Sequence, residues 1–116
     1  MQITLISQEL FDELIAISER YPELIFQNNG YEYLDSAVVA AHAKPLARIH
    51  EILKDHVVGF VKFNNFRQTP VGLVLRFQFN YGAENHSLHF VGVGYLPLAW
   101  LRDGFPESKS VQAYTE

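Results

Sequence analysis

Apolar and polar residues alternate most regularly in the second half of the chain. Residues 73–81 carry Leu, Phe and Tyr at every second position, with Val, Arg, Gln and Asn between them. Such alternation is typical of a strand with one face against a core. Residues 57–66 and 87–96 read as strands on either side, and turn-forming residues lie at 69–72 and 82–85. The pattern therefore predicts three consecutive antiparallel strands.

The alternation also predicts how these strands pair, because a slip of one residue would turn every side chain to the other face. Keeping the large apolar residues together pairs Phe63 with Phe77 and Phe79 with Phe90. Gly92 and the glycine two residues later then lie on the core face, beside large residues. We therefore expect a helix to cross the sheet closely at these glycines.

Apolar residues recur at helical spacing near the start of the chain, over residues 8–20. Ser7 is a suitable N-cap, and Pro22 ends the helix because the residue before a proline is disfavoured in the α region. Apolar runs at 24–27 and 31–34 then flank an Asn-Asn-Gly turn. An Asn-Gly pair between two such runs predicts a β-hairpin, since both residues tolerate positive φ.

The remaining elements have weaker patterns. Residues 2–6 alternate slightly and predict a short edge strand. Pro45 interrupts the next helical pattern, so we expect a short helix near 37–43 and a second helix with Pro45 in its first turn. The sequence alone leaves open whether Pro45 kinks one helix or starts another. A last short helix is expected over 98–102.

Together these elements predict a single α+β domain over residues 1–106. Its antiparallel sheet combines the three C-terminal strands with the N-terminal hairpin, and two main helices pack on one face. The order strand, helix, two strands, helix, strand resembles the start of a ferredoxin-like arrangement with extra strands. That arrangement serves many unrelated functions, so it decides nothing about chemistry. Residues 107–116 are polar and are expected to form a disordered tail.

The composition agrees with a globular domain. Apolar residues make up 48% and charged residues 19% of the 116 residues, and a chain of this length can bury a core. The absence of cysteine excludes disulfides, thiolate metal sites and a cysteine nucleophile. The first residues lack the pattern of a signal peptide, and no stretch is long and apolar enough to span a membrane. We therefore expect a cytoplasmic protein without membrane contact.

Charge is distributed unevenly along the chain, whose net charge is −4. Residues 1–35 hold seven acids and one base, whereas residues 36–80 hold six bases and two acids. Without a basic cluster the chain is not expected to bind nucleic acid. The simplest interpretation is that the two regions attract each other within one domain. The acidic helix also offers an acidic surface to a basic protein partner, formed by Glu9, Asp12 and Glu13.

Catalytic and metal-binding patterns are weak. His86 and His89 form an H-x-x-H pair near Glu84, but three such groups in a loop-to-strand segment are more often solvated surface than a metal site. No serine lies in a nucleophile elbow, and no glycine-rich phosphate loop is present. No metal or cofactor is therefore predicted. The other histidines are expected at the surface or at helix ends: His42, His50 and His56.

The second face of the predicted sheet is the most informative surface. With Val61 on the core side, it collects polar residues at one end: Lys62, Asn64, Arg76, Gln78, Asn80 and His89. The same face carries Phe60, Phe66, Val74, Val91, Val93 and Tyr95. A solvated face would carry polar residues throughout rather than so many apolar groups. We call this surface, with both sets of residues, the mixed face.

Three explanations of the mixed face remain open at this point. The C-terminal helix and tail could cover it. It could pair with a second copy or with another protein, because exposed apolar patches with Tyr and Arg are typical of interfaces. It could instead line a pocket for an anionic small molecule held by Arg76, Lys62 and His89.

We interpret the chain as a non-enzymatic protein-interaction module, such as an inhibitor, an immunity-type protein or an adaptor. It would form a homodimer if the mixed face binds a second copy. The expected binding residues are Arg76, Asn64, Gln78 and Tyr95, followed by Lys62, Asn80 and His89 and by the acidic surface. The alternative is a small-molecule binding protein or a small enzyme with a pocket around Arg76 and His89.

Overall fold

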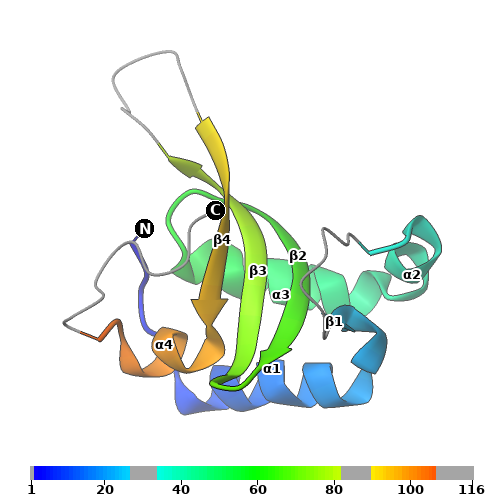
Figure 1. Cartoon of the computed structure of the whole chain (residues 1–116), viewed down its shortest axis with the longest axis horizontal. Helices are drawn as coiled ribbons and strands as arrows, with labels where there is room; N and C mark the ends of the chain where they lie inside the picture. Colours follow the sequence, from blue (N-terminus) through cyan, green and yellow to red (C-terminus); the bar gives the residue numbers. More distant parts are fainter. Residues whose placement is uncertain (1, 27–33, 82–89, 107–116) are drawn as a thin grey trace.

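The computed structural model describes residues 2–26, 34–81 and 90–106. Within these ranges the chain forms a single α+β domain, with a four-stranded sheet and helices packed against it (Figure 1). The helices are α1 (Gln8–Arg20), η1 (Pro22–Leu24, a 3₁₀ helix), α2 (Ser36–Ala41), α3 (Ala43–His56) and α4 (Leu98–Asp103). The strands are β1 (Ile25–Phe26), β2 (Phe60–Thr69), β3 (Gly72–Tyr81) and β4 (Phe90–Pro97). The predicted α+β fold class is confirmed.

The helices form where their sequence patterns place them. α1 covers the predicted residues 8–20, and the Ser7 hydroxyl accepts a hydrogen bond from the Leu10 N–H at 3.1 Å, as an N-cap does. Pro45 is the third residue of α3, where an N–H would have no intrahelical partner. It therefore lies in the first turn of a new helix. In the described part of the chain, no helix is long and apolar enough to cross a membrane.

The sheet is mixed rather than wholly antiparallel. Its strand order is β1-β2-β3-β4, and β1 pairs with β2 in parallel, with Ile25 opposite Phe66. The other two pairings are antiparallel, as predicted. The first arm of the predicted hairpin is thus a strand of the sheet. The hairpin turn and most of its second arm lie outside the described residues.

The predictions for residues 2–6 and for the C-terminal tail have different outcomes. Residues 2–6 form no strand but one isolated bridge, between Ile3 and Val57. The predicted edge strand is therefore wrong. The segment is held by backbone hydrogen bonds to His56, Val58 and Leu101 and by the buried side chain of Ile6. Since no strand precedes α1 in the sheet, the ferredoxin-like arrangement stays a resemblance only. The tail predicted at 107–116 lies outside the described residues.

Three phenylalanines of β2 reach the core face at every third position instead of every second. They are Phe60, Phe63 and Phe66, opposite Phe79, Phe77 and Leu75 of β3. The register shifts once after Phe60 and again after Phe63, so each shift inserts one extra residue, as in a β-bulge. The prediction that Phe60 and Phe66 belong to the mixed face and Val61 to the core face is therefore wrong. Phe66 is fully buried in the core, and Val61 is exposed.

β4 is shifted by two residues along β3 from the predicted register. Phe79 lies opposite Gly92, and Tyr81 lies opposite Phe90. A shift of two keeps each side chain on its predicted face. The space above Gly92 is filled by the Tyr81 ring, because a Cβ at Gly92 would lie 2.7 Å from Tyr81 Cε1. A side chain at position 92 would therefore clash with a ring of the neighbouring strand, and not with a helix as predicted.

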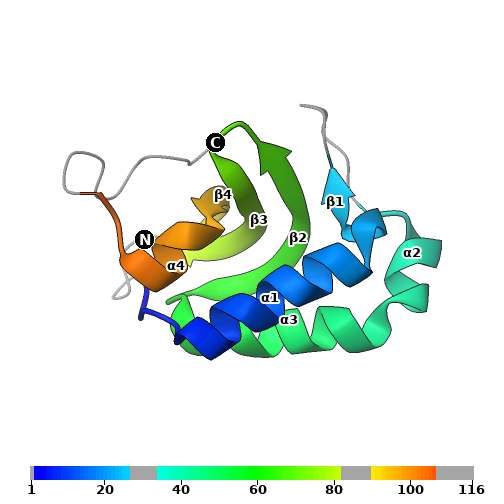
Figure 2. The same cartoon turned by 90° about the horizontal axis from the view of Figure 1, so that it is seen from below.

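One hydrophobic core lies between the sheet and the helices. α1 and α3 lie side by side on one face of the sheet (Figure 2), as predicted. Leu14 of α1, Ile49 of α3 and Phe77 of β3 are fully buried there. α4 adds Leu98 and Leu101 to the same core. The C-terminal helix therefore packs on the core side of the sheet and does not cover the mixed face.

Candidate functional site

Arg76, the expected anchor for a partner or ligand, is buried in the middle of the sheet. It is 2% exposed, and its Nε donates a hydrogen bond to the hydroxyl of Tyr95, directly opposite on β4, at 3.1 Å. The guanidinium carbon of Arg67 lies 5.1 Å from the centre of the same ring, which is a cation–π distance. The structure thus brings together the predicted Arg76 and Tyr95. It adds Arg67, which was not among the residues expected from the sequence.

Asn64 is also buried, and its place in the register differs from the one that the predicted Phe63–Phe77 pair implies. Asn65, not Asn64, lies opposite Arg76, because the second bulge of β2 inserts a residue. Asn64 is 4% exposed, and its Nδ2 has no hydrogen-bond acceptor in the described structure. A buried donor without an acceptor costs about 1–3 kcal/mol. Asn64 therefore retains a hydrogen-bonding capacity that the fold does not use.

The other polar residues of the mixed face lie toward its open end. Lys62 pairs with Gln78 across β2 and β3. Lys62 and Asn80 are exposed, and Gln78 is half-buried. His89, the last predicted member, lies outside the described residues. The mixed face is thus divided into a buried part around Arg76 and an exposed part around Lys62.

The far end of β3 and β4 carries three exposed apolar side chains. Tyr81, Phe90 and Val91 are 53%, 51% and 56% exposed. The rings of Tyr81 and Phe90 face each other across the two strands, 5.7 Å apart and at 27°. β2 begins at Phe60, opposite Phe79, so β3 and β4 extend past it as a two-stranded ribbon (Figure 1). We call Tyr81, Phe90 and Val91 the ribbon end.

The predicted acidic surface on α1 is partly used within the domain. Glu9 and Asp12 are exposed, and Asp12 accepts a hydrogen bond from Gln8 at 2.9 Å. Glu13 instead pairs with Arg48 of α3, whose Nη2 lies 2.9 Å from Glu13 Oε1. The hydrogen bonds from Arg48 lower the pKa of Glu13. Two of the three predicted carboxylates therefore remain directed to solvent.

The histidine pattern gives no metal site in the described ranges, where no three His, Asp or Glu side chains are close enough to hold an ion. His86, His89 and Glu84 lie outside those ranges. His42 Nε2 lies 3.0 Å from an oxygen of Glu23. His42 therefore joins the end of α2 to η1.

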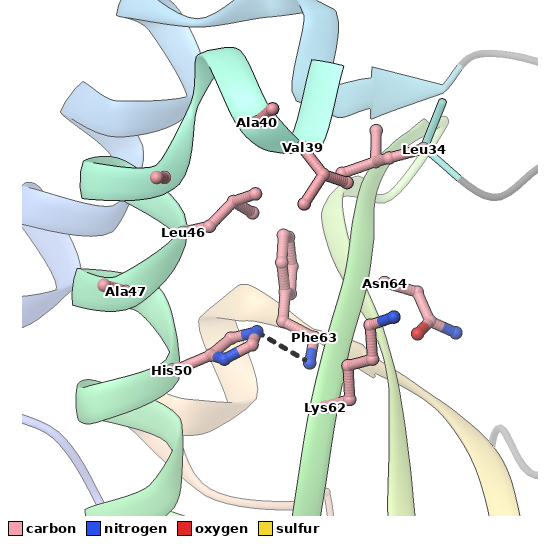
Figure 3. A pocket seen from close by; sticks show the side chains of 10 residues that line it. Leu34, Val39, Ala40, Leu46, Ala47, His50, Lys62, Phe63 and Asn64 are labelled. Carbon is pink, nitrogen blue, oxygen red and sulfur yellow. Dashed lines mark hydrogen bonds between the residues drawn. The ribbon is translucent and has the colours of Figure 1, made fainter. Parts of the chain in front are cut away.

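A groove of about 390 Å³ lies between the helices and the edge of β2 (Figure 3). Residues 62, 63 and 64 line it from β2. Because successive residues of a strand point to opposite faces, a groove lined by three in a row runs along the strand edge. β1 pairs with β2 only at Phe66 and Arg67, so no described strand covers this edge. We call it the β2-edge groove; its helix side comprises Val39, Ala40, Ala43, Leu46, Ala47 and His50.

His50 lines this groove and is hydrogen-bonded to the strand edge. Its Nε2 accepts the N–H of Phe63 at 3.3 Å, and its ring packs edge-on against Phe60. Burial lowers the pKa of His50, and the ammonium group of Lys62 lowers it further. The neutral ring is therefore the favoured form. The expectation that His50 lies at the surface or at a helix end is wrong.

One sequence signal could have indicated the two bulges in β2. Phe60, Phe63 and Phe66 recur at intervals of three, and a strand can place such residues on one face only if residues are inserted between them. The two insertions change which residues of β2 share a face. The partner of His50 could not be predicted, since it depends on how closely α3 approaches β2.

Comparisons with known proteins identify no relative. No protein-family model matches the chain, and no curated protein and no solved structure is significantly similar to it.

Proposed function

We propose that the chain is a non-enzymatic protein-interaction module that binds through the ribbon end and the adjoining exposed part of the mixed face. The supporting observation is the exposure of Tyr81, Phe90 and Val91 on two adjacent rungs of β3 and β4. Large apolar side chains gathered at one place on a surface are typical of interaction sites, and aromatic residues are enriched there.

The ribbon offers apolar groups on both of its faces. Tyr81 and Phe90 share the face that points toward the core elsewhere in the sheet, whereas Val91 lies on the mixed face beside Asn80. Lys62 and Asn80 add exposed hydrogen-bonding groups next to the apolar centre. Interfaces typically combine an apolar centre with a polar rim of this kind.

This proposal moves the contact away from three of the residues expected from the sequence. Arg76 and Asn64 are 2% and 4% exposed, and the Tyr95 hydroxyl is hydrogen-bonded to Arg76. Their substitution would act mainly through the stability of the sheet. Lys62, Gln78 and Asn80 stay in the proposed contact.

The partner in this proposal is either a second copy of the chain or a different protein. The second case includes the inhibitor, immunity-type and adaptor roles. Glu9 and Asp12 supply exposed negative charge that would steer a basic partner. The alternative, an anionic ligand around Arg76 and His89, stays a prediction. A different observation, the β2-edge groove, favours a small-molecule site elsewhere.

The test places one negative charge at the ribbon end. Val91→Glu adds a carboxylate to the apolar patch, and the matched control Val71→Glu adds one to a 74% exposed valine in the β2–β3 turn. Wild type and both variants are used for co-purification from the native host and for sedimentation equilibrium. We expect a stoichiometric partner or a dimer with wild type and Val71→Glu, and its loss with Val91→Glu.

Thermal unfolding of each variant checks that the added charge leaves the fold intact. Association that survives Val91→Glu would refute the ribbon end as the contact. A wild-type chain that is recovered alone and sediments as a monomer would refute the interaction role itself.

A further inference from the structure

The β2-edge groove has the size of a small-molecule site. Its volume of about 390 Å³ lies at the lower end of the range of about 300–1,000 Å³ that such sites occupy. Apart from His50 its helix side is apolar, and three exposed alanines on α2 and α3 contribute to it. Because an alanine side chain ends at Cβ, these positions leave the space that a longer apolar residue would fill. They are Ala40, Ala43 and Ala47.

The polar groups on the strand side of the groove are hydrogen-bond donors. Lys62 contributes an exposed ammonium group, and Asn64 contributes a buried Nδ2 that has no acceptor. Both side chains lie on the side of β2 opposite to Phe63 (Figure 3). Among the described residues that line the groove there is no Asp or Glu. This end therefore complements a negatively charged acceptor.

His50 disfavours the addition of a peptide strand along the same edge. Strand addition needs backbone N–H and C=O groups that are free to pair. The N–H of Phe63 points to this edge and is already donated to Nε2 of His50 at 3.3 Å. A small molecule that uses side-chain donors fits the groove better than an extended peptide does.

From these observations we infer that the β2-edge groove binds a small aliphatic monocarboxylate. Its carboxylate is held by the Lys62 ammonium group and accepts a hydrogen bond from Asn64. Its hydrocarbon chain lies along the helix wall at Ala43 and Leu46, where burial of apolar surface supplies most of the affinity. The site lies apart from Tyr81, Phe90 and Val91 of the ribbon end but shares Lys62 with the proposed contact. Its test with octanoate does not depend on the proposed interaction function.

Octanoate is the probe, titrated into the ¹⁵N-labelled full chain and followed by amide chemical shifts. We expect saturable shifts that centre on Ala43, Phe63 and Asn64, with a dissociation constant in the millimolar range or below. Octanol, which has the same chain without the charge, should bind more weakly. Absence of saturable shifts at millimolar octanoate, or equal binding of octanol, would overturn the inference.

Two pairs of variants locate the site. Lys62→Gln should weaken octanoate binding by about fivefold. Lys54→Gln, which removes an exposed lysine of α3, should leave the affinity for octanoate unchanged. Ala43→Leu should fill the groove and abolish binding, whereas Ala16→Leu on the exposed side of α1 should leave it unchanged. Equal affinity in both members of either pair would place the ligand elsewhere and overturn the inference.

Asn64→Ala separates a role in binding from a role in folding. Because Asn64 is 4% exposed, Asn64→Ala should lower the melting temperature of the ligand-free chain through lost packing. It should weaken octanoate binding. A lowered melting temperature together with unchanged octanoate affinity would show that Asn64 serves the fold and not the ligand.

Discussion

Glu13 on α1 accepts hydrogen bonds from two nitrogens of the Arg48 guanidinium group on α3. Nη2 lies 2.9 Å from Oε1, and Nε pairs with Oε2. Nη1 of the same arginine lies 2.7 Å from Glu51, one turn further along α3. The acid-rich first third of the chain and the base-rich middle third are therefore joined directly, as the simplest interpretation of the charge pattern predicted. A carboxylate expected to face a partner is used inside the domain.

Removal of the Glu13 charge should loosen the contact between α1 and α3. We expect Glu13→Gln to lower the melting temperature by roughly 2–4 °C, since a half-exposed ion pair contributes modestly to stability. Glu51→Gln removes the exposed acid that also pairs with Arg48 and should have a smaller effect. Differential scanning calorimetry at low salt measures both variants, and equal effects would contradict a special role for Glu13.

The same pair predicts a pH dependence. The folded-state pKa of Glu13 lies below its ordinary value of 4.5, because Arg48 stabilises the carboxylate. Its contribution to stability is therefore complete above the unfolded-state pKa and is lost as the pH falls through the folded-state pKa. Urea unfolding from pH 6 to pH 3 should show a smaller loss of stability in Glu13→Gln than in wild type. Parallel curves would contradict this assignment.

Gly59 occupies a position that no residue with a side chain can adopt without strain. Its φ is +78°, and a Cβ there would lie 2.6 Å from the carbonyl oxygen of Asn80. We expect Gly59→Ala to lower the free energy of unfolding by more than about 2 kcal/mol. Gly72 also has a positive φ, of 111°, but open space around it, so Gly72→Ala should cost about 1 kcal/mol. Chemical denaturation that ranks the two variants in the opposite order would contradict the steric argument.

Helix positions and the order of the antiparallel strands could be predicted because their signals are local. Ser7, Pro22 and Pro45 act on the residues beside them, and the alternation in β3 depends on that strand alone. The parallel pairing of β1 could not be predicted in this way. It joins Ile25 to Phe66, which are far apart in the sequence, and no local pattern distinguishes this pairing from a hairpin.

Substitutions in β2 can test whether its side chains alternate at every second residue or are shifted by the two bulges. If its residues faced the core at intervals of two from Phe63, Val61 would be buried and Phe66 would not. In the structure Phe66 is 0% and Val61 44% exposed. We therefore expect Phe66→Ala to cost about 3–5 kcal/mol of unfolding free energy and Val61→Ala less than about 0.5 kcal/mol. Urea unfolding that gives comparable losses for both would contradict the inserted residues.

The candidate site was predicted less well than the fold, and the bulges explain much of the difference. The second inserted residue puts Asn65 instead of Asn64 opposite Arg76. Lys62 stays opposite Gln78, as the predicted pairing of Phe63 with Phe77 implies. Arg76 and Tyr95 were correctly placed on one face because β3 and β4 are displaced by an even number of residues. The burial of Arg76 depends on packing that alternation does not encode.

His50 supplies a final prediction, in a pH range different from that of Glu13. Burial holds the folded-state pKa of His50 below its ordinary value of 6.5. Protonation of Nε2 would also place an N–H against the N–H of Phe63, which that nitrogen accepts in the neutral ring. The stabilising contribution of the neutral ring is therefore complete above about pH 6.5 and is lost as the pH falls from there through the folded-state pKa.

Wild type should accordingly lose stability between pH 7.5 and pH 5, before the carboxylates protonate. His50→Gln keeps an acceptor in reach of Phe63 but cannot take up a proton in this range, so it should lose less stability over the same interval. Urea unfolding at the two pH values gives the four free energies needed. Their double difference isolates the titration of His50 from the cost of the substitution, which is common to both pH values. A double difference of zero would mean that His50 binds its proton equally well in the folded and unfolded chains, and the buried neutral ring would then be the wrong description of the strand edge.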